Sequence, residues 1–264
     1  MRLPRAFDLI YRHRALITHS IGSELRYRTA GTSFGLLWLV LTPLLLLAVY
    51  SIVYLAIFRV RPTAMTEVQY VLYLFCGLVP FLAMAEAMLA GLGALATNQA
   101  LLGSTMFPAE ILPMRAVLAS QSGFAVGLVL LVLAAWWVGQ PSASWLLLVP
   151  LVILQLLFSI GLGWALAVSA LVLRDLHHVM SFVIILLMVL SPIAYTPDML
   201  PTALRAVIWL NPFAYFVLAY QQILMYGAIP SLWQATVLLL LGPLTFLAGF
   251  AFFNRVRIIV ADYA

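Results

Sequence analysis

One acidic residue, Glu86, lies well inside a long apolar stretch of the sequence, between Phe81 and Leu95. A carboxylate at membrane depth is costly and usually marks a functional position, such as a proton or ion site. Two interpretations stay open: Glu86 drives ion-coupled transport, or it faces a wet cavity or pairs with an arginine as a structural group. An ion-coupled transporter usually needs more than one such carboxylate, and no second one lies inside a predicted span.

A second group of reactive residues follows another apolar stretch: Arg174, Asp175, His177 and His178. A hydrolase or transferase needs a nucleophile beside a base and an orienting acid, and no Ser or Cys is placed to complete that set. A metal site needs more ligands nearby. A solvated loop with a local Arg–Asp pair is therefore favoured, and a membrane enzyme of lipid or glycan assembly remains the alternative.

Other chemistry is limited by residue types that the sequence lacks or nearly lacks. All thirteen basic residues other than histidine are arginines. Without lysine the chain has no phosphate-binding Walker A loop, so it cannot hydrolyse ATP by that route. The single cysteine, Cys76, cannot form a disulfide within the chain or hold a metal by itself. We expect no catalytic site, no metal site and no cofactor bound by this chain.

The composition shows what must position these residues. Of 264 residues, 66% are hydrophobic and 8% are charged, and the mean hydropathy is +1.14. Soluble domains contain about 25% charged residues, so we expect an all-α integral membrane protein. The net charge of +5 comes from arginines beside the apolar stretches. Membrane topology and anionic lipids explain that charge better than nucleic acid does.

Six apolar stretches predict transmembrane helices within a single domain, residues 34–264. Five have the length of about 20 residues that a membrane span needs. The sixth is shorter and ends at Ser191-Pro192. The predicted spans are about 34–58, 70–95, 116–138, 145–173, 179–194 and 232–253.

Two further helical elements flank or interrupt these spans. Residues 1–33 have an apolar face opposite a charged one, which predicts an amphipathic helix in the membrane interface. Residues 195–230 are too polar and too broken for one span, and Asn211-Pro212 divides them. We expect a re-entrant or interfacial helical hairpin there.

The arginines predict the orientation. With the N-terminus in the cytosol, ten arginines fall on the cytosolic side and three on the other, which satisfies the positive-inside rule. The ten are Arg2, Arg5, Arg12, Arg14, Arg26, Arg28, Arg115, Arg174, Arg255 and Arg257, and the three are Arg59, Arg61 and Arg205. Both termini are therefore expected in the cytosol.

Several stretches together resemble permeases of the type-2 ABC exporter family. Residues 26–43 read RYRTAGTSFGLLWLVLTP, similar to the family's entrance to the first span. Residues 191–212 read SPIAYTPDMLPTALRAVIWLNP, similar to its Ser-Pro, Leu-Pro and Leu-Asn-Pro signature before the last span. Permeases of this length resemble capsular-polysaccharide and O-antigen exporters.

The resemblance implies a function and partners. Such a permease is a homodimer that works with a separate cytosolic ATPase subunit, which binds ATP and Mg, and with a periplasmic and outer-membrane export partner. It moves a lipid-linked polysaccharide outward across the bacterial inner membrane. We expect a capsular polysaccharide, with O-antigen, teichoic acid or a small lipophilic drug as alternatives. An ion-coupled flippase that uses Glu86 is the alternative from another class.

The resemblance also implies roles for particular residues. The uncharged, partly apolar loop 96–112 would contact the ATPase, and the N-terminal helix would lie beside the lipid head group. The ATPase-coupling residues would be Asn98, Gln99, Leu102, Met106, Phe107, Pro108 and Glu110. The substrate entrance would hold Arg26, Arg28 and Trp38. The substrate path would hold Tyr50, Tyr54, Tyr70, Tyr73 and Glu86, because tyrosines can stack on sugars. The periplasmic gate hairpin would hold Tyr195, Leu200, Trp209, Asn211, Phe213 and Tyr215.

Overall fold

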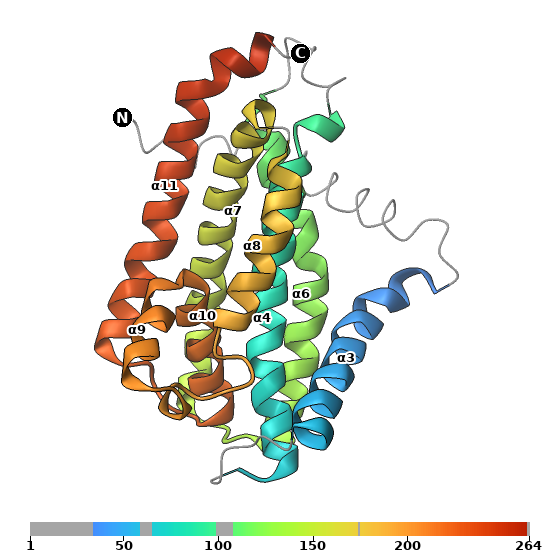
Figure 1. Ribbon diagram of the computed structural model, residues 1–264, viewed down its shortest axis with the longest axis vertical. Helices are drawn as coiled ribbons and strands as arrows, with labels where there is room; N and C mark the ends of the chain where they lie inside the picture. Colours follow the sequence, from blue (N-terminus) through green and yellow to red (C-terminus); the bar gives the residue numbers. More distant parts are fainter. Residues whose placement is uncertain (1–33, 59–64, 99–107, 174, 263–264) are drawn as a thin grey trace.

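The computed structural model describes residues 34–58, 65–98, 108–173 and 175–262 (Figure 1). These residues form helices and contain no strand, which confirms the all-α class. The predicted N-terminal interface helix, residues 1–33 with Arg26 and Arg28, lies outside the described residues. So do Gln99, Leu102, Met106 and Phe107 of the predicted coupling loop.

Within the described part of the chain, five helical segments are long and apolar enough to cross a membrane. The first joins a short 3₁₀ turn, α3 (Trp38–Ser51) and a π-helical end, η2 (Ile52–Ile57). The next two are α4 (Glu67–Gly93) and α6 (Ile111–Val138). The last two are α7 (Leu148–Val172), which a 3₁₀ turn precedes, and α11 (Leu232–Asp262), apolar to Val256.

The remaining helices are shorter. The helix α8 (Leu176–Leu190) has 15 residues and rises about 22 Å, so it is short for a span, as its sequence indicated. After it come η5 (Pro197–Met199), α9 (Thr202–Leu210), α10 (Pro212–Tyr220) and the π-helical η6 (Gln221–Met225). The bundle therefore has a hairpin end, where α9 and α10 lie, and a loop end, where α4 connects to α6 (Figure 1).

The helix α4 is the centre of the bundle. In its most apolar window 83% of the residues are buried, against 6% in the segment that contains α3. Its first turn is fixed by a capping box between Thr66 and Gln69, a pairing that satisfies two backbone donors at a helix start. The neighbours α6, α7 and α10 surround it.

Glycines allow the backbones to approach closely at two crossings. A Cβ atom on Gly91 of α4 would overlap Gly163 of α7, and one on Gly249 of α11 would overlap Gly161 of α7. Small residues at helix crossings give the close packing that holds membrane helices together. The helices α4, α7 and α11 consequently form one tightly packed unit.

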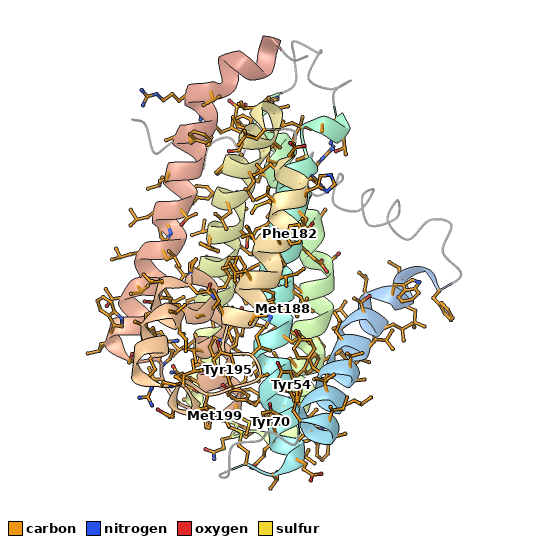
Figure 2. All side chains as sticks on the ribbon, viewed as in Figure 1. Tyr54, Tyr70, Phe182, Met188, Tyr195 and Met199 are labelled. Carbon is orange, nitrogen blue, oxygen red and sulfur yellow. The ribbon has the colours of Figure 1, made fainter. Side chains whose placement is uncertain are left out.

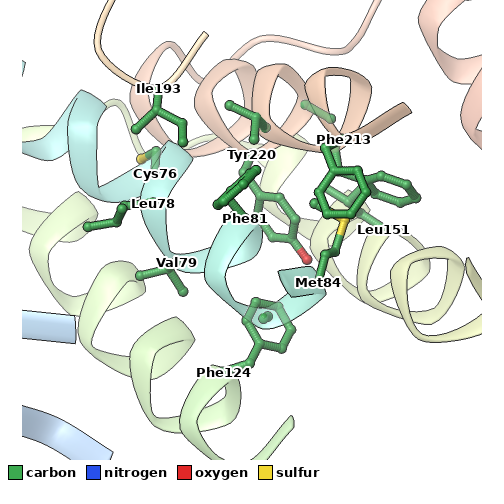
Figure 3. Packing of buried hydrophobic residues seen from close by; sticks show 14 of the residues in the cluster. Cys76, Leu78, Val79, Phe81, Met84, Phe124, Leu151, Ile193, Phe213 and Tyr220 are labelled. Atoms are coloured by element: carbon green, nitrogen blue, oxygen red, sulfur yellow. The ribbon is translucent and has the colours of Figure 1, made fainter. Parts of the chain in front are cut away.

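Aromatic and sulfur-containing side chains fill the core beside α10 (Figure 3). The rings of Phe81 and Phe213 lie 5.6 Å apart between centroids, and those of Phe124 and Tyr220 lie 6.2 Å apart. Met84 is buried in the same cluster. This core joins α4 and α6 to the second helix of the hairpin.

The helices α3 and α8 lie outside this core. Of the residues of α8, Met180 alone is buried, and Phe182 is 74% exposed. Phe182 and Met188 project along α8 in Figure 2. Pro43 is the one buried residue of α3. Most of the surface of both helices is therefore left for lipid or for another subunit.

Candidate functional site

The helix α8 ends at Leu190, and from Ser191 the chain continues as irregular backbone beside the hairpin end of α4. Three side-chain donors satisfy three carbonyl oxygens of this break. The pairs are Tyr70 hydroxyl to Ala194 (2.6 Å), Tyr73 hydroxyl to Tyr195 (3.0 Å) and Gln221 Nε2 to Pro192 (2.9 Å). Backbone carbonyls that are buried away from water require such partners, so the break is a built feature of the fold.

Two of these donors were assigned a different role from the sequence. Tyr70 and Tyr73 were expected along a substrate path, but their exposed fractions are 0% and 2%. Their hydroxyls donate hydrogen bonds to backbone carbonyls of the break. We therefore assign both tyrosines to holding the break in place.

The sequence reasoning missed two residues that shape the same break. Gln221 begins the π-helical segment η6, a conformation that often occurs at functional positions. Gly77 of α4 leaves space for the Gln221 side chain and for the backbone of the break. A Cβ at this position would lie 3.0 Å from Gln221 Nε2 and 3.1 Å from the Cα of Ile193. Neither residue has a sequence signal, because an isolated glutamine or glycine in an apolar stretch fits any helix.

The predicted gate residues do come together at the hairpin end. Asn211 caps α10 by accepting from the backbone N–H of Phe213 (3.0 Å), and it donates to the Ser191 hydroxyl (2.9 Å). The Tyr215 hydroxyl donates to the carbonyl of Trp209 (3.0 Å). Asn211 thus ties the junction between α9 and α10 directly to the break.

Tyr195 and Leu200 complete this cluster. Both pack against the small buried group formed by Ile208, Ala214 and Leu218. The Tyr195 hydroxyl donates to the carbonyl of Leu190 (2.9 Å). Burial raises the pKa of Tyr195, and nearby Tyr54 adds to the effect, so the hydroxyl remains a donor at physiological pH.

A line of aromatic rings runs along the hairpin end of α3 and η2. The ring centroids of Tyr50 and Tyr54 lie 5.9 Å apart in a stacked pair, and those of Tyr54 and Phe58 lie 5.9 Å apart at an angle of 61°. We call these three residues the aromatic ladder. Its rings are half-buried or exposed, and Tyr54 and Tyr195 lie toward the same face in Figure 2. Aromatic faces of this kind can pack against sugar rings.

Glu86 lies in a cleft of about 170 Å³ between α3, α4 and α6. Leu39, Thr42 and Pro43 of α3 form one wall, and Gly123 of α6 lies opposite, where a Cβ would stand 4.0 Å from Glu86 Oε2. The Glu86 side chain is exposed in this cleft. Trp38 packs edge-on against Phe34 at the start of the same segment, but it does not line the cleft.

At the loop end, the two ends of the connection between α4 and α6 are tied down. Arg115 donates to the Asn98 side-chain oxygen (2.7 Å), and the Trp164 indole donates to the Glu110 carbonyl (2.8 Å). Glu110 is buried, and Pro108 is half-buried. These three of the predicted coupling residues are thus described, and they lie at the base of the connection.

The candidate enzyme residues, apart from Arg174, which lies outside the described residues, are at the start of α8. Asp175, His177 and His178 are exposed there. Among the residues that the structure describes, no group of three His, Cys, Asp or Glu side chains is close enough to hold a metal ion.

A sequence comparison decides among the classes that this architecture allows. The model of the ABC-2 type transporter family matches residues 19–225. The chain belongs to the ABC-2 type transporter family. The family expected from the sequence is thereby confirmed. Members of this family are membrane permease subunits of ABC transporters and not ATPases themselves, and this chain is accordingly a multi-pass membrane protein.

Three proteins named as O-antigen export permeases are similar to this chain over most of its length. An O-antigen export system permease protein RfbA of Klebsiella pneumoniae is 26% identical over 259 residues, 97% of each chain. A second Klebsiella pneumoniae protein of that name is 26% identical over 253 residues, 95% of this chain and 93% of its own. One from Myxococcus xanthus is 27% identical over 225 residues, 84% of this chain and 85% of its own.

Proposed function

We propose that this ABC-2 permease exports a lipid-linked polysaccharide outward across the bacterial inner membrane, driven by ATP hydrolysis in a separate subunit. The observation that carries the proposal is the full-length similarity to O-antigen export permeases, 97% of both chains in one case. The missing lysine agrees with it, because the ATP-hydrolysing machinery must then lie on another chain.

The relatives bear on which polymer is exported. The sequence motifs led us to expect a capsular polysaccharide, whereas the relatives are named for O-antigen export. We therefore propose an O-antigen-type polysaccharide in place of the capsular one. The aromatic ladder suits either polymer, since stacking on sugar rings does not depend on their order in a chain.

The proposed machinery consists of a homodimer of this chain and two copies of a cytosolic ATPase that binds ATP and Mg. The exposed helices α3 and α8 would face the second copy and the polymer path, because they contribute little to the core. The loop end would receive the ATPase, and Arg26, Arg28 and Trp38 would attract the lipid phosphate at the cytosolic surface. The hairpin would act as the gate at the periplasmic side, where an export partner would receive the polymer.

Deletion of the gene in its own host tests the proposal. Loss of export should remove the polymer from the cell surface and leave its lipid-linked form inside the cell, and the intact gene should restore the surface polymer. Extracted lipid-linked glycan and surface glycan are both measured by gel electrophoresis and sugar analysis. Unchanged surface glycan in the deletion strain would contradict the proposal, and loss of both forms would favour the enzyme of glycan assembly.

A further inference from the structure

The connection between α4 and α6 is closed at its base by a pair of side chains. Asn98 accepts a hydrogen bond from Arg115 through its oxygen (2.7 Å) and donates through its nitrogen to the Ala94 carbonyl (2.8 Å). Asn98 is therefore fixed to the end of α4 and to the first turns of α6 at once. Thr97 adds a bond to the Gly93 carbonyl (2.9 Å) on the α4 side.

A second anchor joins the same connection to α7 and α11. Trp164, which is fully buried, donates to the Glu110 carbonyl (2.8 Å) just before α6 begins. Its ring lies 5.0 Å from that of Phe246 and 5.1 Å from that of Phe250, both on α11. Trp164 therefore links the connection to α7 and α11, so that a movement of the connection is transmitted to both helices through these contacts.

Within the described residues, the hydrogen bonds of the two anchors do not involve α3 or α8. The hydrogen bonds and ring contacts described join α4, α6, α7 and α11. The close glycine crossings at Gly91 and Gly161 further join α7 to α4 and to α11. The helices α3 and α8 leave most of their surface outside that body. The helices α4, α6, α7 and α11 thus form one body that is attached to the connection, whereas α3 and α8 pack on the outside of this body.

We propose that Asn98 and Arg115 are positioning residues that brace the α4–α6 connection, so that α4 and α6 move as one body when the ATPase subunit acts on it. This inference rests on the proposed function, in which that subunit meets the loop end. Neither residue is assigned a contact with nucleotide or glycan. A hydrogen bond between a guanidinium and an amide oxygen is charge-assisted and strong. Such a bond suits a contact that must stay formed while the ATPase subunit moves the connection.

The test uses the permease purified with its own ATPase in lipid nanodiscs. A fluorescent label on the variant Val129→Cys reports ATP-driven movement of α6, since Val129 is exposed on α6 while the native Cys76 is buried and stays unlabelled. The labelled protein is the parent, and it is compared with four variants made in it: Asn98→Leu, Arg115→Met, their double variant and the conservative Asn98→Asp. Arg255→Met is the matched control, an exposed arginine of α11 toward the same end of the bundle.

We expect Asn98→Leu and Arg115→Met to lower the label response per ATP hydrolysed about tenfold, the ratio that corresponds to one hydrogen bond to a charged group. The double variant should lose no more than either single one, and Asn98→Asp, which still accepts from Arg115, should keep the response. The control should match the parent.

Any other result contradicts the proposed role of Asn98 and Arg115. A parent response in both single variants, or losses that add in the double variant, would show that the pair does not act as a unit. If Arg115→Met fails to fold, the comparison of Asn98→Asp with Asn98→Leu decides instead, and equal responses contradict the proposal. A parent complex that neither forms nor hydrolyses ATP would overturn the proposed function itself and the brace with it.

Discussion

The hydroxyl of Tyr70 lies 2.6 Å from the carbonyl oxygen of Ala194, although the two residues are 124 positions apart in the chain. This bond joins the central helix α4 to the irregular segment that follows α8. It shows that the helix break is held in a defined place by the helix that crosses beneath it. Tyr73 and Gln221 add two parallel bonds to the same segment.

Removal of the Tyr70 hydroxyl should destabilise the protein. Tyr70→Phe keeps the buried ring but leaves the Ala194 carbonyl without its donor, which costs about 1–3 kcal/mol for a buried group. Thermal unfolding in detergent should show a lower Tm. Tyr54→Phe is the control, because among the described residues no hydrogen bond to the Tyr54 hydroxyl is seen, and its Tm should stay near that of the parent. Equal Tm values for the two variants would contradict the role given to Tyr70.

Two glycines on one helix should respond oppositely to alanine. In Gly91→Ala the new Cβ would overlap the backbone of Gly163, and such overpacking costs about 1–3 kcal/mol or more. In Gly93→Ala the nearest atom would be 3.9 Å away, on His177, so the usual helical preference for alanine applies, about 0.5–1 kcal/mol. Circular dichroism melts should separate the pair, and a Gly91→Ala protein as stable as Gly93→Ala would refute the close crossing.

The aromatic ladder should matter for transport through its rings. Tyr54→Leu removes a ring that stacks on Tyr50, and a stacking contact of about 0.5–1.5 kcal/mol corresponds to a several-fold lower rate of polymer appearance at the cell surface. Tyr54→Phe keeps the ring and should export at nearly the parent rate. Surface glycan measured over time after induction distinguishes them. Equal loss in both variants would assign the function to the hydroxyl and not to the stacking face.

Much of this architecture could be predicted from the sequence because its signals are local. Apolar length gave the five long helices, and the short stretch before Ser191-Pro192 anticipated α8 and its break. Asn211-Pro212 was expected to divide the hairpin into two helices, and the structure shows Asn211 as the cap of α10. Such signals depend only on neighbouring residues, so they can be recognised without knowledge of the fold.

The partners of the break could not be predicted, because they depend on which helix lies at the centre. Tyr70 and Tyr73 were expected beside a sugar polymer, since tyrosine toward a membrane surface is compatible with stacking, packing and interfacial roles. The central position of α4, 83% buried in its most apolar window, decides for packing. Gln221 has no sequence signal at all, because its importance comes from the backbone it meets on another segment.

Energy coupling separates the ABC reading from a transporter that uses Glu86. We expect export in membrane vesicles to continue when ionophores collapse the proton and sodium gradients, provided that ATP is supplied inside. Vanadate, which blocks ABC ATPases, should stop it while the gradients are intact. The readout is glycan that becomes accessible to an added glycosidase. Export that follows the gradients and ignores vanadate would return Glu86, in its cleft between α3, α4 and α6, to the centre of the mechanism.

The most direct test of the central claim is to purify the tagged chain from its native membrane and to assay the product for ATP hydrolysis. We predict that a second protein with a phosphate-binding lysine motif co-purifies, that the complex hydrolyses ATP, and that Glu110→Ala in the permease weakens the association. The buried Glu110 lies at the base of the connection that would meet the partner. A chain that is recovered alone, fully folded and without ATPase activity under conditions that preserve other ABC complexes would contradict the account.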